Sequence, residues 1–161
     1  MFGASALYHR VNWSPKVEPS MMQVDKTGIY LMIAGTFTPV VSVGISGRFS
    51  DALLAIVWVL TAILIANLWM PWTPPYGLIT ASYIGVGWLG LLAVPGMWTQ
   101  VGPTFTFMIL GGGLLFTIGG ILLALRKPRL WPTTFGYHEL WHVLVIAGAS
   151  IHFVALIIYV F

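Results

Sequence analysis

Apolar stretches of about twenty residues dominate this sequence, and they limit the folds that it can adopt. Hydrophobic residues make up 58% of the 161 residues and charged residues only 7%. A soluble domain carries about 25% charged residues, so this chain has too little charge to cover a water-exposed globule. About 20 apolar residues in a helix suffice to cross the bilayer core. We therefore predict five membrane spans, at residues 27–45, 52–70, 76–94, 104–125 and 139–161.

The spans are expected to be helices. Backbone groups within lipid must bond to one another, which leaves only helices and closed barrels. A barrel strand would alternate polar and apolar residues over about 10 positions, and these stretches do not. The sequence therefore predicts an all-α integral membrane protein, a multi-pass helical bundle in which residues 1–161 form a single transmembrane domain.

The basic residues predict an orientation. Six of the seven lie before the first span or between the fourth and fifth, and with five spans these two segments face the same side. The positive-inside rule places that side in the cytoplasm and the C-terminus outside the cell membrane. The six residues are Arg10, Lys16, Lys26, Arg126, Lys127 and Arg129, and only Arg48 lies on the opposite side.

Composition also excludes some classes of site. The chain contains no cysteine, so disulfides and thiolate metal sites are ruled out. Its net charge of +3 comes from seven basic and four acidic residues, which is too sparse for a nucleic-acid surface. Membrane lipids are the expected partners, and the oligomeric state is not predicted.

His138 and His142 belong to an H-E-x-x-H sequence, the helix motif of soluble zinc proteases. Residues four apart share one helix face, so both rings can bind one Zn²⁺. Taken alone, the pair is equally well explained as interfacial polar residues at a helix entrance. Glu139 would be the general base in a protease. In this chain, which has almost no polar surface, we predict an interfacial or supporting carboxylate instead.

Other ionisable residues lie on the same predicted side. His9 precedes the first span and Asp25 lies at its entrance, which adds a third imidazole and a carboxylate at the depth of the His138 pair. Three histidines and a water form the open coordination of catalytic zinc. Asp25 could equally be the N-cap of the first span, and Ser5, one turn before His9, could be a packing residue. His152, about 15 Å deeper than His142, is predicted to be a buried hydrogen-bonding residue.

Several segments resemble the hemolysin III family, part of the progestin and adipoQ receptor group that includes the adiponectin receptors. They are SALYHR, DKTGIYLMIAGTFTP and FGYHELWHVLV, and GWLG and GGGLLFTIGG fit the same family. The resemblance implies a seven-helix membrane protein with zinc near the cytoplasmic side. Five spans are present here, so the chain is expected to be truncated at the N-terminus relative to the family. The resemblance assigns His9, His138 and His142 as zinc ligands, Asp25 as the holder of a zinc-bound water, and Ser5 as a supporting residue.

Three functions follow as hypotheses. The wider superfamily includes alkaline ceramidases, so the first hypothesis is a zinc-dependent hydrolase of lipid amides or esters, in which Asp25 orients or deprotonates the attacking water. The second is a non-enzymatic receptor-like or membrane-stress protein with structural zinc. The third is a pore-forming cytolysin, as the family name suggests. We rank it last because the spans offer few polar side chains to line a pore.

The glycines at residues 111–113, 119 and 120 are predicted to mediate close helix packing.

Overall fold

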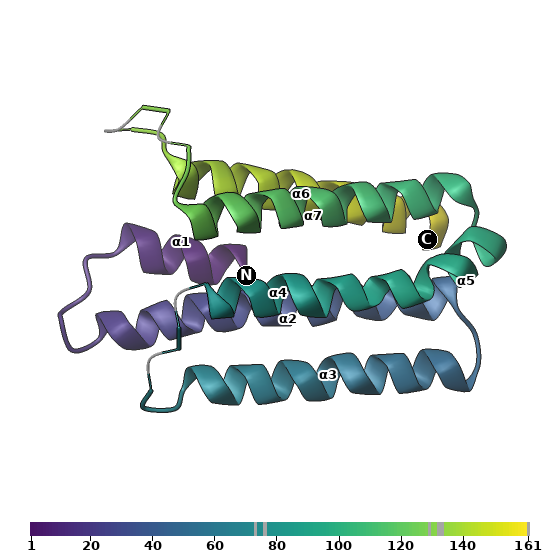
Figure 1. Ribbon diagram of the computed structural model, residues 1–161, viewed down its shortest axis with the longest axis horizontal. Coiled ribbons are helices and arrows are strands. Elements are labelled where there is room, and N and C mark those ends of the chain that lie inside the picture. Colours follow the sequence, from purple (N-terminus) through teal and green to yellow (C-terminus); the bar gives the residue numbers. More distant parts are fainter. Residues whose placement is uncertain (73, 76, 129, 132–133, 161) are drawn as a thin grey trace.

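Helices running side by side form the molecule, as the computed structural model shows (Figure 1). The structure describes residues 1–72, 74, 75, 77–128, 130, 131 and 134–160. Five helical segments are long and apolar enough to cross a membrane, and no strand is assigned among the described residues, which confirms the all-α, five-span fold class. The segments are α2 (Glu18–Gly44), α3 (Arg48–Leu68), α4 to α5 (Leu78–Gln100), α6 (Pro103–Leu125) and α7 (Tyr137–Val160).

The first span begins earlier than predicted. α2 starts at Glu18 instead of residue 27, because an acidic residue and Pro19 in its first turn suit a helix N-terminus. The apolar stretch therefore marks only the lipid-facing part of a longer helix. As a consequence Asp25 lies about two turns inside α2, and the N-cap is Val17. The alternative that Asp25 caps the first span is wrong, and its carboxylate is free for another role.

The third span also differs from its predicted bounds. α4 (Leu78–Trp88) continues through a 3₁₀ segment, Leu89–Ala93, into α5 (Val94–Gln100), whereas the predicted span ended at residue 94. Pro95 does not end the helix, because it lies in the first turn of α5, where its missing N–H costs no hydrogen bond. The predicted start of this span at Tyr76, and the predictions for Arg129 and Phe161, concern positions outside the described residues.

Three glycines in the same segment match the G-x-G-x-x-G spacing of dinucleotide-binding proteins. They are Gly85, Gly87 and Gly90. In those proteins the motif joins a strand to the start of a helix. Here it lies within α4 and the 3₁₀ segment of a membrane span, so it does not indicate a nucleotide site.

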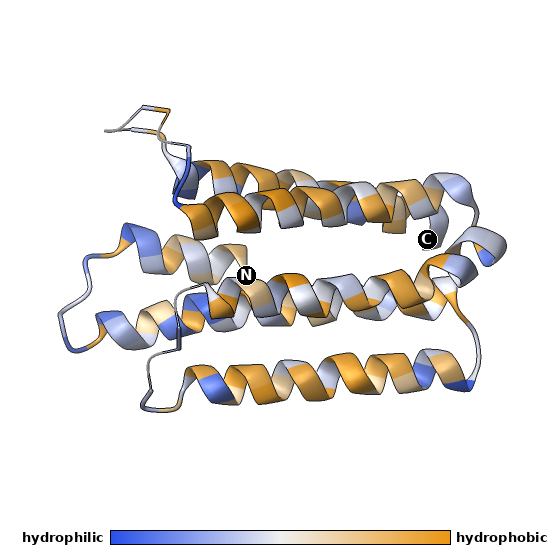
Figure 2. Cartoon of the chain, in the orientation of Figure 1, coloured by the Kyte–Doolittle hydropathy of each residue, from blue (hydrophilic) through white to orange (hydrophobic). Residues whose placement is uncertain are grey.

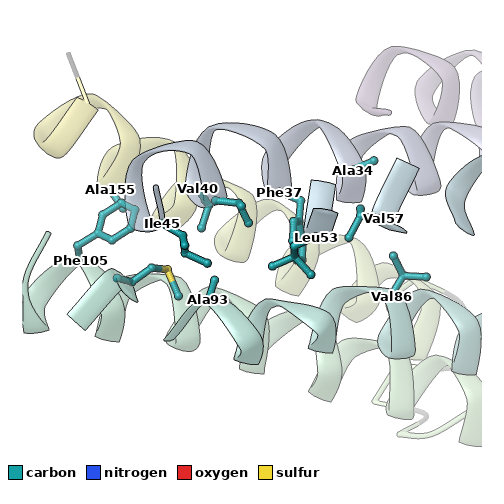
Figure 3. Packing of buried hydrophobic residues seen from close by; sticks show 12 residues of the cluster. Ala34, Phe37, Val40, Ile45, Leu53, Val57, Val86, Ala93, Phe105 and Ala155 are labelled. Carbon is teal, nitrogen blue, oxygen red and sulfur yellow. The ribbon is translucent and has the colours of Figure 1, made fainter. Parts of the chain in front are cut away.

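The main apolar core extends from the end of the bundle where α2 meets α5 and α6 begins to the middle of α2 and α3 (Figure 3). Phe105 and Met97 are fully buried there. The backbones approach closely, since a Cβ on Gly96 would lie 2.5 Å from the Gly44 carbonyl oxygen. Large apolar side chains also cover the outer faces of the long helices, where lipid would meet them (Figure 2). Because lipid is as apolar as the core, close packing rather than water exclusion holds these helices together.

Glycines bring α6 and α7 into contact, as predicted. A Cβ on Gly112 would collide with the His152 ring and lie 3.0 Å from the Gly148 carbonyl oxygen. A Cβ on Gly119 would lie 3.0 Å from the Trp141 ring. A Cβ on Gly111 or on Gly113 would meet no atom within 4 Å, so only part of the glycine-rich segment mediates packing.

A short helix completes the fold. α1 (Phe2–Arg10) lies beside α2 at the end of the bundle that carries the α6–α7 loop (Figure 1). Its start rests on Gly28 of α2, where an added Cβ would lie 3.2 Å from the Met1 Cα. α1 carries both Ser5, which is buried, and His9, which lies at its C-terminal end. This placement directs the end of α1 toward the first turns of α7.

Candidate metal centre

Three histidine side chains from opposite ends of the chain converge at this end of the bundle. The Nε2 atom of His138 lies 3.4 Å from that of His9 and 3.1 Å from that of His142. One candidate ligand atom from each of the three residues lies within 4.8 Å of the others. The helical spacing of α7 brings its two rings together, and the packing of α1 adds the third.

The spacing of these nitrogens suits a metal ion. Zinc binds imidazole nitrogen at about 2.0–2.1 Å with tetrahedral geometry, which places two ligand nitrogens about 3.3 Å apart. The two Nε2–Nε2 distances that involve His138, 3.4 and 3.1 Å, lie on either side of that value, and the His9 and His142 ligand atoms lie within 4.8 Å of each other. An all-imidazole set suits zinc among the common metals, although copper, nickel and iron also accept it. The residues therefore fit a three-nitrogen site with one open coordination position.

Asp25 lies beside the cluster. Its Oδ2 atom is 3.9 Å from His9 Nε2, and its side chain is 15% exposed compared with 36% for His9. A carboxylate at this position would balance the charge of a cation held by the three histidines. Three elements, α1, α2 and α7, thus contribute to one site.

Ser5 and Tyr8 of α1 are at least partly shielded from solvent, whereas Leu7 and Arg10 are exposed. Ser5, one turn earlier, is 8% exposed and is the buried residue of this helix. The Tyr8 ring packs edge-on against His9, with centroids 4.7 Å apart. Burial, followed by the Glu18 and Asp25 carboxylates, raises the pKa of Tyr8, so its phenol stays neutral at ordinary pH.

Glu139 has a different role from that of its counterpart in zinc proteases. Its Oε2 atom accepts a hydrogen bond of 2.7 Å from the Gly136 N–H, and the side chain is exposed. α7 begins at Tyr137, so Glu139 is at the third helical position and reaches back to the residue that precedes the helix, as in half of a capping box. Its carboxylate stabilises the helix start that carries His138 and His142.

His152 is buried and hydrogen-bonded, as predicted. Its Nε2–H donates to the Ile109 carbonyl oxygen of α6 at 2.8 Å, and its exposed fraction is 8%. The described metal-ligand cluster consists of His9, His138 and His142 and does not include it.

A cavity of about 130 Å³ beneath the cluster was not predicted from the sequence. Side chains of α2, α4, α6 and α7 line it. Its wall includes Ile29, one turn beyond Asp25, and Trp141, which adjoins His142 in the sequence, and it reaches His152. Trp141 and His152 are eleven residues apart, or about 16 Å along the helix. We call this cavity the chamber; its wall is mainly apolar, so hydropathy does not distinguish it from a packed core.

Comparison with known proteins gives one consistent family. The family model described as "Haemolysin-III related" matches residues 1–153. Hemolysin-3 of Bacillus cereus is 31% identical over 159 residues, covering 97% of this chain and 68% of that protein. The hemolysin-3 homolog of Bacillus subtilis is 28% identical, covering 99% of this chain and 71% of that protein. The adiponectin receptor protein of Drosophila melanogaster is 27% identical over 81% of this chain and 33% of its own length.

No solved structure matches the chain significantly. The family model covers nearly the whole sequence, including all three histidines of the cluster and Asp25. The resemblance deduced from the sequence motifs is therefore confirmed. This multi-pass membrane protein belongs to the haemolysin-III-related family.

Proposed function

We propose that this protein binds one Zn²⁺ through His9, His138 and His142 and hydrolyses amide or ester bonds of lipids. The observation that carries the proposal is the convergence of three imidazole nitrogens within 4.8 Å, beside a carboxylate and above an apolar chamber. A structural zinc site is normally closed by four protein ligands, whereas three ligands leave a position for water and substrate.

The chemistry divides between the metal and the protein. A bound zinc ion polarises a substrate carbonyl and lowers the pKa of water to about 7. The Oδ2 atom of Asp25 takes a proton from the attacking water and returns it to the departing amine or alcohol. Ser5, buried one turn before His9, supports the position of α1 and so the ligand at its end.

The chamber supports a lipid substrate. Its wall is mainly apolar and extends from the region of the histidines toward the middle of the membrane. A short apolar part of a lipid in the chamber would lie close to the cluster, where the polar head group can remain in water. The apolar wall would also exclude water from that part of the lipid.

Basic residues support a cytoplasmic location of the site in the cell membrane. Arg10 ends α1 and Lys16 follows it, and Arg126 and Lys127 lie in the α6–α7 loop at the same end (Figure 1). The positive-inside rule then places the histidine cluster on the cytoplasmic side and the end of α7 on the outer side.

Two alternative functions can be distinguished from lipid hydrolysis by experiment. The name of the Drosophila relative favours a receptor-like protein with structural zinc, which would hold the metal and turn over no lipid. The names of the Bacillus relatives favour cytolysis by a pore. A pore needs a continuous polar lining, and the predominantly apolar chamber favours a bound lipid instead.

The test combines metal content with turnover. Detergent-purified protein should hold about one zinc per chain by mass spectrometry, and His9→Ala, His138→Ala and His142→Ala should each lose it at equal folded yield. His152→Gln is the matched control outside the cluster and should retain it. Ceramide, other N-acyl lipids and glycerol esters are then assayed with a verified ceramidase alongside. Absence of zinc from well-folded protein overturns the site, and zinc without turnover of any of these lipids overturns the hydrolase.

A further inference from the structure

His9 is carried by a helix that few side chains fix to the bundle. α1 has 9 residues, and Ser5 is its buried residue. The apolar side chains of Phe2 and Leu7 are 48% and 46% exposed. The other two histidines of the cluster stand on α7, a helix of 24 residues that packs along α6. The position of the third ligand therefore depends on a small number of contacts.

Two kinds of contact locate α1 in the bundle. At its start, Gly28 of α2 permits a close approach, since an added Cβ would lie 3.2 Å from the Met1 Cα. At its end, His9 Nε2 lies 3.4 Å from His138 Nε2 and 3.9 Å from the Asp25 carboxylate. Among the described residues, the hydrogen bonds, ion pairs and ring contacts from α1 side chains to other helices all involve His9. A backbone contact thus fixes the start of α1, and the imidazole cluster fixes its end.

The imidazole cluster cannot satisfy all of its own contacts. Each ring nitrogen offers either one hydrogen or one lone pair. The Nε2 atom of His138 faces two other Nε2 atoms, at 3.4 and 3.1 Å, so it can form one good hydrogen bond at most. A metal ion accepts a lone pair from each of the three nitrogens and so satisfies both contacts at once. Metal binding would therefore strengthen the attachment of His9, and with it that of α1.

We propose that Gly28 positions His9 through α1, and that metal binding and the docking of α1 against α2 reinforce each other. This inference rests on the zinc site of the proposed function and is independent of lipid hydrolysis. A ligand that binds one state of a protein stabilises that state, and the coupling is reciprocal. Zinc should therefore order α1. A side chain at position 28 should in turn weaken zinc binding, because the Met1 Cα is a backbone atom and only a shift of α1 can make room.

Zinc affinity tests the positioning role of Gly28. Competition with a chromophoric chelator should show that Gly28→Leu binds zinc about 10–100-fold more weakly than the parent protein, as do changes in residues that orient a metal ligand. Gly28→Ala should have a smaller effect, because α1 need shift by only a few tenths of an ångström. Gly35→Leu is the matched control on α2, since an added Cβ there would meet no atom within 4 Å. Equal affinities of the two leucine variants would overturn the positioning role.

The position of α1 is measured separately from affinity. Because the chain lacks cysteine, spin labels can be attached at Leu7→Cys on α1 and at Phe49→Cys at the opposite end of the bundle, both exposed residues. Pulsed electron paramagnetic resonance gives the distances between the two labels. We expect a broad distribution in metal-free protein, which narrows when zinc is added and broadens again with a chelator. In His9→Ala zinc should leave the distribution unchanged, whereas a purely structural role of Gly28 predicts no response to zinc in any variant.

The outcomes separate this inference from the proposed function. Zinc binding by the parent protein without any change in the label distances overturns the coupling and leaves the zinc site standing. A well-folded parent protein that binds no zinc overturns the site and this inference together. Ordering of α1 by zinc without turnover of any lipid overturns the hydrolase alone. If Gly28→Leu does not fold, the affinity of Gly28→Ala and the zinc response of the parent protein decide the question.

Discussion

The contact of Gly112 with His152 gives the sharpest test of the packing. In Gly112→Ala the new methyl group collides with the His152 ring and meets the Gly148 backbone oxygen at 3.0 Å. The backbone oxygen cannot rotate away, so α6 and α7 must separate or the ring must move. Overpacking of this kind costs about 1–3 kcal/mol. Loss of the hydrogen bond between His152 and the Ile109 carbonyl oxygen adds about 1 kcal/mol to this cost. The higher helix propensity of alanine offsets about 0.5–1 kcal/mol of it.

The net expectation is a loss of about 2 kcal/mol, or a change of about 30-fold in the unfolding equilibrium. Gly111→Ala is the matched control, because its methyl group would meet no atom within 4 Å. That variant should be neutral or more stable by up to about 1 kcal/mol. Equilibrium unfolding in mixed detergent micelles, followed by circular dichroism, measures both. If the two variants agree within about 0.5 kcal/mol, the assignment of Gly112 to the α6–α7 contact is refuted.

Three further predictions concern the site and its orientation. Asp25→Asn should retain zinc but lower the rate of lipid hydrolysis at least about 100-fold, because it removes the proton acceptor; loss of zinc would make Asp25 a ligand instead. Glu139→Ala should lose the bond to Gly136 and destabilise the protein by about 1 kcal/mol or less in thermal unfolding, with zinc content unchanged, and a loss of zinc would contradict a capping role. Because the chain lacks cysteine, Ser14→Cys and Ser46→Cys give single labelling sites on exposed residues of opposite ends. In intact cells an impermeant maleimide should label only Ser46→Cys, and the reverse pattern would refute the orientation.

The sequence by itself determined the number of spans and the histidine pair of α7. Bilayer thickness requires about 20 apolar residues for each span, so length and hydropathy suffice to find them. The helical repeat places His138 and His142 on one face without any knowledge of the fold. Span ends were less predictable, because α2 continues beyond its apolar part to Glu18 and α5 accommodates Pro95 in its first turn.

Only the tertiary structure decided which groups meet. His9 is 129 residues from His138, and their 3.4 Å contact depends on how α1 packs beside α2 and α7. Hydropathy cannot distinguish Gly112 from Gly111, because in a membrane both the core and the surroundings are apolar. The chamber and the unpartnered Nδ1 of His152 are hidden for the same reason. Apolar character specifies that a helix enters the bilayer, but shape complementarity between helices decides which of its faces is buried.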